Sequence, residues 1–294
     1  MSELNNVFIV DERAVDPLKR VHVPNANTMV IGDGRARNDT CAAIIGFRSV
    51  LRSSTYSGQA EDAMYPFSNC LDFRDNTQYS PAATSGSVVI YFSQLAGSEM
   101  DYLGIGIHDG RTAGLSGKLE VLTGGDWVEV AVFSPTGDNK TIVEYFDGIV
   151  SSRQRLTLNF TSKLHIGNIY LGKAWVFDKT PAIGFTPGHT NSLDKLEAFN
   201  SDTNQFMMAR VIKRGYGQKG QFNFIPWADE RDSFESQYIE YMEHVKSGKA
   251  VFMKWNKDLQ QNFFGRAANP NSLQAPTYAN NTSGTFYFDY KGFV

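Results

Sequence analysis

The chain has 294 residues, of which 41% are hydrophobic and 13% aromatic, and its formal net charge is -3. Since domains average roughly 150 residues, this length predicts two of them. The basic residues are scattered among acidic ones, which argues against a nucleic-acid partner. Apolar runs are strand-sized and far short of the ~20 residues that a membrane helix needs, which argues against membrane insertion.

The composition favours strands over helices. It includes 21 Phe, 13 Tyr and 26 Gly, the flat and turn-forming residues typical of β-rich proteins. The first thirteen residues carry acids and lack the apolar core of an export signal, so we expect synthesis in the cytoplasm. Cys41 and Cys70 have no metal-site or secretory context, and we interpret them as free thiols.

The first segment, residues 1–40, is polar and rich in turn residues. Only Val7 to Val10 has the pattern of a strand, and Pro17 and Pro24 follow it. We expect an N-terminal arm that packs on its own domain or on a neighbouring chain.

Residues 41–180 contain short apolar alternations separated by turn residues every 8–12 positions. This spacing is typical of a jelly-roll-type β-sandwich. The predicted strands are 87–92, 102–107, 118–122, 127–133, 141–146, 155–160, 165–171 and 174–177.

Residues 181–294 follow a break at Lys179 to Pro187 and predict a smaller α+β domain. Its one predicted helix, 232–246, carries apolar residues at helical spacing, followed by Gly248 at the position of a C-cap. The predicted strands are 206–212, 221–224, 250–255 and 284–290. We expect the helix stripe to pack against the face formed by Val251, Met253 and Trp255.

The segment from Tyr65 to Pro81 carries Asn69, Asp72, Thr77 and Tyr79 at the spacing found where galactose-binding-like (discoidin-type) domains begin. Later matches are Tyr102 to Ile105, His108 to Gly110, Trp127 and Ile166 to Gly172. The first domain therefore resembles a galactose-binding-like β-sandwich, although a sugar-binding loop of Arg, His and Trp is not evident.

The second domain resembles modules of minor tail and baseplate proteins at the tail tip of tailed bacteriophages. The resemblance rests on Asn223 to Trp227, the acidic helix, Gly248 to Asn256, Gly265 to Ala267 and Phe286 to Asp289. It implies a structural protein of the virion, made in the host cytoplasm. Its expected partners are other tail or baseplate proteins in a homo-oligomeric ring.

Aromatic residues in predicted loops are the candidate binding residues, because exposed Tyr rings serve both sugar stacking and protein contacts. They are Tyr56, Tyr65, Tyr79 and Tyr216.

A candidate calcium site consists of Asp72, Asp75 and Asn76, whose side chains offer hard oxygen ligands. The alternative is a turn that these side chains cap themselves. No other cofactor is predicted.

No pattern indicates an enzyme. His108 and Asp109 are adjacent, and neighbours on a strand point to opposite faces, so they cannot form a proton relay. The histidines lack zinc-site spacing.

Two functions remain open. One is a structural component of a phage tail tip that supports host attachment, and the other is a carbohydrate-binding module that recognises a surface glycan. A glycan-processing enzyme would need a carboxylate pair in a cleft, which nothing in the sequence places.

Overall fold

The computed structural model describes residues 43–72, 76–138, 140–177, 180–181, 195–200, 207–213, 217–226, 231–256, 262–269, 277–280 and 283–292. The predicted strand Val7 to Val10, Cys41 and most of the predicted junction at residues 179–187 lie outside these ranges. Residues 40–294 make one compact unit. No helix in the described part of the chain is long and apolar enough to cross a membrane.

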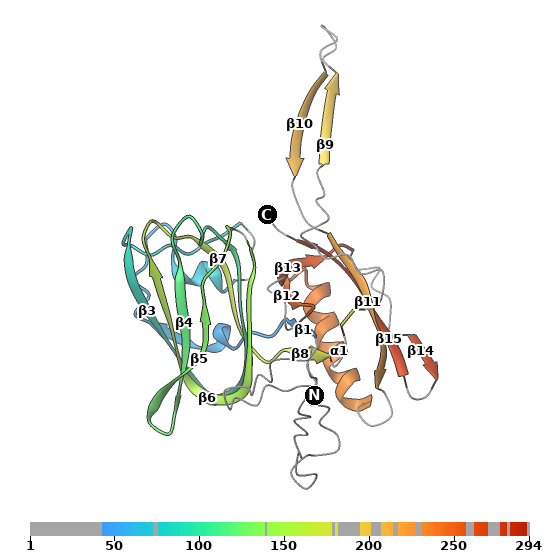
Figure 1. Cartoon of the computed structure of the whole chain (residues 1–294), viewed down its shortest axis with the longest axis horizontal. Helices are drawn as coiled ribbons and strands as arrows, with labels where there is room; N and C mark the ends of the chain where they lie inside the picture. Colours follow the sequence, from blue (N-terminus) through green and yellow to red (C-terminus); the bar gives the residue numbers. More distant parts are fainter. Residues whose placement is uncertain are drawn as a thin grey trace, which may run out of the picture. The chain divides into compact units, whose positions relative to one another are not determined.

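The fold is mainly β, as predicted, with a curled β-sandwich and a second sheet that packs on a helix (Figure 1). The sandwich strands follow the order β2-β3-β6-β4-β5, with β7 added on β3. Their bounds are β2 Thr55–Ser57, β3 Gly86–His108, β4 Ser116–Thr123, β5 Asp126–Phe133, β6 Ile142–Phe160 and β7 Ile166–Gly172.

Two long strands build both layers of the sandwich. β3 pairs with β6 first through residues 86–93 and then, after an irregularity between Ser93 and Ser98, through residues 98–105. The first half of β3 lies beside β2, and its second half pairs with β7. The sequence predicted two separate strands in each of these segments, because polar residues interrupt the alternation where the strands bend.

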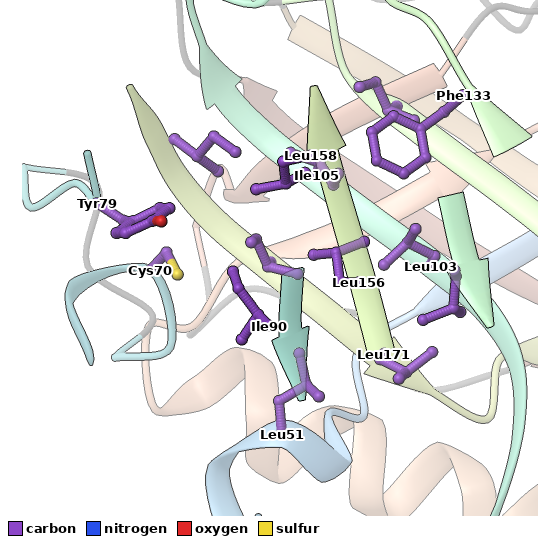
Figure 2. Packing of buried hydrophobic residues seen from close by; sticks show 14 of the residues in the cluster. Leu51, Cys70, Tyr79, Ile90, Leu103, Ile105, Phe133, Leu156, Leu158 and Leu171 are labelled. Atoms are coloured by element: carbon purple, nitrogen blue, oxygen red, sulfur yellow. The ribbon is translucent and has the colours of Figure 1, made fainter. Parts of the chain in front are cut away.

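The sandwich core lies between the layers and is mostly aliphatic. Figure 2 shows Leu103, Ile105, Leu156 and Leu158 gathered there, each at most 1% exposed. Alternate residues of each strand point inward, which is why the period-two pattern was visible in the sequence. Cys70 is a free, buried thiol at one end of this core, as predicted.

The second sheet has the order β11-β15-β13-β12-β1-β8, with β14 added on β15, and a separate hairpin is made by β9 and β10. The bounds are β1 Ala43–Gly46, β8 Trp175–Phe177, β9 Lys195–Asn200, β10 Met207–Lys213, β11 Gly217–Pro226, β12 Val251–Lys254, β13 Asn262–Ala267, β14 Thr277–Asn280 and β15 Ser283–Gly292. The helix α1 spans Arg231–Lys246, and short 3-10 turns occupy Val50–Ser53 and Phe67–Cys70.

The strand at residues 174–177, predicted as the last of the sandwich series, belongs instead to the second sheet. β8 pairs with β1, and β1 pairs with β12 (Figure 1). Local alternation identifies a strand but not its partner, because the same apolar face can pack in either core.

The helix prediction is confirmed, and so is its packing. Phe234, Tyr241 and Val245 are buried in one cluster with Val251 and Met253 of β12. After the helix, Gly248 has a φ of 74°, a conformation that favours glycine at a C-cap. The apolar stripe therefore covers one face of the second sheet.

The other face of the second sheet packs on the sandwich. Phe252 and Phe264 lie in a buried cluster with Tyr102 and Tyr170 of the sandwich. A Cβ on Gly104 would lie 2.6 Å from the Phe252 ring, so this glycine leaves the space that the ring fills. β12 is thus buried on both faces, which explains its continuous apolar run.

Candidate functional site

Five polar and aromatic side chains meet where β3 ends and β7 begins. They come from three separate segments and are called the loop cluster here: Asp62, Tyr65, Asp109, Lys163 and His165. The side chains of Asp62, Asp109, Lys163 and His165 are between 30% and 35% exposed, so they are held in place yet open to solvent.

Backbone hydrogen bonds fix the segments that carry the loop cluster. The N–H of Tyr79 donates to the carbonyl of Ile166 at 2.8 Å, and the Ile166 N–H donates back at 3.0 Å. Ser80 donates to the carbonyl of Tyr65 at 3.0 Å, and Asp62 donates to the carbonyl of Ser80 at 2.9 Å. The loop of residues 62–65 is therefore tied to the start of β7 through residues 79–80.

Asp109 orients the His165 ring. Its Oδ2 lies 2.8 Å from His165 Nδ1, and its Oδ1 accepts the His165 backbone N–H at 2.7 Å. Because a carboxylate oxygen accepts hydrogen bonds, the proton between the two groups is placed on Nδ1, and Nε2 lies on the side of the ring away from Asp109. The Tyr65 ring contacts the imidazole edge-on, with the centroids 5.7 Å apart.

Lys163 and Asp62 form the second half of the loop cluster. The ammonium donates to Asp62 Oδ2 at 3.0 Å and to the carbonyl of Pro81 at 2.7 Å, which uses two of its three N–H groups. The Met64 N–H, which donates to Asp62 Oδ1, and the bond from Lys163 lower the pKa of Asp62, so this carboxyl stays ionised. Met64 itself is 78% exposed.

Two residues near the loop cluster have left-handed backbone conformations that glycine usually adopts. Ala60 has a φ of 41°, and Ile107, two residues before Asp109, has a φ of 53°. Such conformations cost roughly 1–3 kcal/mol each and persist where the surrounding structure enforces them. They set the direction in which the chain enters the cluster.

His108 has a structural role. It is 2% exposed, its Nδ1 accepts the Gly110 N–H at 3.1 Å, and its Nε2 lies 2.8 Å from the carbonyl of Lys140. Burial lowers the pKa of His108 and keeps the ring neutral. Asp109 faces His165 instead, so the adjacent side chains of His108 and Asp109 contact different partners.

Of the four predicted binding aromatics, Tyr79 is buried and Tyr56 is half-buried against the core. Tyr79 is fully buried and donates its hydroxyl to the carbonyl of Gln59 at 2.5 Å, and Tyr56 packs against Phe67 with centroids 5.1 Å apart. Tyr56 lies in the short strand β2 and Tyr79 pairs with Ile166 in an isolated bridge, so neither stands in the open loop that the sequence suggested. Tyr65 belongs to the loop cluster, and Tyr216 lies outside the described residues.

The residues of the candidate calcium site are only partly described. The Thr77 hydroxyl lies 3.1 Å from Asp72 Oδ1 and 3.2 Å from the carbonyl of Asn69, so these residues close their own turn. Asn76 is exposed, and Asp75 lies outside the described residues. No group of three or more His, Cys, Asp or Glu side chains suited to a metal occurs within the described ranges. The calcium hypothesis stays a prediction.

His165, Lys163 and Asp62 were missed as site residues. The only local signal was the polar segment 161–165 between two strands, and a short polar connection occurs at every hairpin. Their meeting depends on pairing between distant segments.

No family model and no curated protein matches the chain. Among solved structures, the chain is similar to SpGH29, with 12% identity over 44% of this chain and 28% of that one, and a TM-score of 0.37. The chain is also similar to the chitosan-binding module 1 of a Paenibacillus sp. IK-5 chitosanase/glucanase, with 14% identity over 43% of this chain and 99% of that one, and a TM-score of 0.36. A third similar structure is the family 32 module of C. perfringens NanJ, solved with galactose, with 15% identity over 44% of this chain and 98% of that one, and a TM-score of 0.35.

Proposed function

We propose that this chain is a carbohydrate-binding module and that the loop cluster holds one sugar residue. The observation that carries the proposal is the Tyr65 ring beside an imidazole whose tautomer Asp109 fixes, with the Lys163 ammonium on the same surface. An aromatic face beside a few placed polar groups is the usual composition of a small-ligand site.

Each group has a defined part in sugar recognition. A sugar hydroxyl donates to His165 Nε2, and another accepts the third N–H of Lys163. The C–H face of the ring stacks on Tyr65. Because Asp109 and Asp62 already hold the two polar side chains, little rotamer entropy is lost on binding.

The proposed activity is binding without hydrolysis. Glycoside hydrolysis needs one carboxyl that stays protonated as the general acid. In the loop cluster, Asp62 is ion-paired with Lys163 and its pKa is lowered, which is the opposite of what an acid catalyst requires.

Calorimetric titration of the full chain with galactose, fucose and chitosan oligosaccharides tests the proposal. We expect at least one probe to bind, and Tyr65→Ala and His165→Ala each to weaken it at least tenfold. Val150→Ala, at an exposed position far along β6, is the control and should bind normally. Binding that persists unchanged in both loop-cluster variants would refute this site, and failure of every sugar to bind would refute the function.

The tail-tip hypothesis stays a prediction, together with its tail or baseplate partners, its ring and its virion location. Size-exclusion chromatography with mass measurement separates the alternatives, because a free binding module elutes as a monomer and a ring subunit elutes as an oligomer.

A further inference from the structure

A second cluster of aromatic and charged side chains lies on the outer face of the sandwich, away from its core. It is called the outer-face cluster and consists of Tyr91, Lys118, Glu120, Trp127 and Arg155. The strand register sets it up: Tyr91 of β3 is opposite Arg155 of β6, and Arg155 is opposite Glu120 of β4. Trp127 stands on the edge strand β5.

The two aromatic rings meet above the sheet. β3 and β5 are three interstrand spacings of about 4.8 Å apart, and Trp127 stands two residues along β5 from Glu129, the residue in line with Tyr91. Measured along the sheet, Tyr91 and Trp127 therefore start roughly 16 Å apart. Their ring centroids are nevertheless only 6.1 Å apart, and the Arg155 guanidinium lies 4.6 Å from the Trp127 centroid. Both rings therefore lean inward over the central strands.

The rings of Tyr91 and Trp127 cover the ion pair between Arg155 and Glu120. Arg155 binds Glu120 through two bonds of 2.6 and 2.8 Å, and Lys118 binds it at 3.0 Å. Glu120 is only 4% exposed although it points away from the core. Bidentate pairing and cation–π stacking hold the rings in one arrangement, so the surface is rigid before any ligand arrives.

The cluster still offers contact area to solvent, and its charges are balanced. Tyr91 is 43% exposed, and Val132 on β5, opposite Lys118, is 60% exposed. Lys118 faces both Glu120 and Glu129, at 3.0 and 3.8 Å. Within the cluster each cation faces a carboxylate, so the cluster itself carries no excess positive charge to select an acidic ligand.

We propose that the outer-face cluster is a second binding surface, for a neutral polysaccharide chain that lies across the strands. The row from Tyr91 through Arg155 to Glu129, with Glu120 covered beneath it, places an aromatic ring and two solvent-accessible polar side chains in line across the strands. An extended chain of sugar rings can follow this pattern. A protein partner would need a wider apolar centre than Tyr91, Trp127 and Val132 supply.

This inference rests on the proposed carbohydrate-binding function and extends it. One polymer that engages the loop cluster and the outer-face cluster together gains affinity, because the second contact becomes intramolecular. A single sugar gains nothing from the second surface.

The test compares polymers with single sugars on the full chain. The probes are a soluble β-glucan, a xylan and a galactomannan, with polygalacturonate as the acidic comparison, in affinity electrophoresis and calorimetry. We expect Trp127→Ala and Tyr91→Ala to weaken binding of one neutral polymer at least tenfold while binding of single sugars is unchanged. Tyr65→Ala should weaken single-sugar binding at least tenfold yet leave residual binding of the polymer.

Val132→Glu guards against a folding artefact, because it places a charge beside the surface opposite Lys118 and leaves the Arg155–Glu120 pair intact. This variant should also bind the polymer more weakly. The second surface is disproved if Trp127→Ala, Tyr91→Ala and Val132→Glu all bind polymers as the parent chain does. Preference for polygalacturonate would contradict a neutral ligand. Both outcomes leave the loop-cluster proposal standing, since that proposal fails only if Tyr65→Ala and His165→Ala have no effect or no sugar binds.

Discussion

The two cores of this protein are built from different side chains. The sandwich core consists mainly of Leu, Ile and Val from two facing layers, whereas the core between α1 and the second sheet consists mainly of aromatic rings. Trp175 lies at its centre, with ring centroids 4.9 Å from Phe177, 5.1 Å from Phe286 and 5.2 Å from Phe234. A single helix on a sheet offers few buried positions, and rings that bury 150–250 Å² each compensate for the small number.

The largest effect should come from the centre of the aromatic core. Trp175→Ala removes a ring that four aromatic neighbours contact, and we expect it to destabilise the protein by about 3–5 kcal/mol. Urea unfolding followed by near-ultraviolet circular dichroism measures the change. Trp175→Phe is the matched control and should cost much less; equal losses would mean that ring size does not organise this core.

The second-largest change in stability should come from Asp101, a buried carboxyl between the two cores. Asp101 of β3 is 6% exposed and accepts the Ala174 N–H at 2.7 Å, just before β8. Burial raises the pKa of Asp101 to about 6, so the ionised carboxyl destabilises the folded state above that pH, and this penalty disappears as pH falls below about 4. Asp101→Asn keeps the acceptor and should stabilise the protein by about 2 kcal/mol at pH 7.5.

The same comparison at pH 4 should show almost no gain, because Asp101 is then protonated in the folded state. Thermal unfolding at the two pH values provides the measurement. A gain of equal size at both would show that the charge of Asp101 is not the cause.

A third variant tests the close contact between Gly104 of the sandwich and Phe252 of the second sheet. Gly104→Ala would place a Cβ 2.6 Å from the Phe252 ring, and overpacking of this kind costs typically 1–3 kcal/mol. Gly148→Ala is the control, since its nearest atom would be a flexible Glu99 oxygen at 3.5 Å. If the two variants unfold at the same urea concentration, Phe252 has room to move and the contact is not tight.

The smallest effect should come from the aliphatic core. Ile105→Val removes one methylene among neighbouring aliphatic side chains, and a loss of about 1 kcal/mol is expected. Urea unfolding gives the value. A loss as large as that of Trp175→Ala would mean that the sandwich, not the aromatic core, limits stability.

By itself the sequence determined the helix and the most strongly alternating strands, but it gave no signal for the short strands β1, β2, β9, β13 and β14. The period-two pattern of β4 and β5, and the helical spacing of Phe234, Tyr241 and Val245, each record which face of an element is buried. This information is local, since it follows from the geometry of a single strand or helix.

Only the tertiary structure decided which elements meet. It paired β1 and β8 with β12, buried Tyr79 although its segment is irregular, and brought Asp109, Lys163 and His165 together with Tyr65. The periodicity of a strand shows that one face is buried but not what buries it. The loop cluster and the outer-face cluster therefore depend on pairings between residues far apart in the chain.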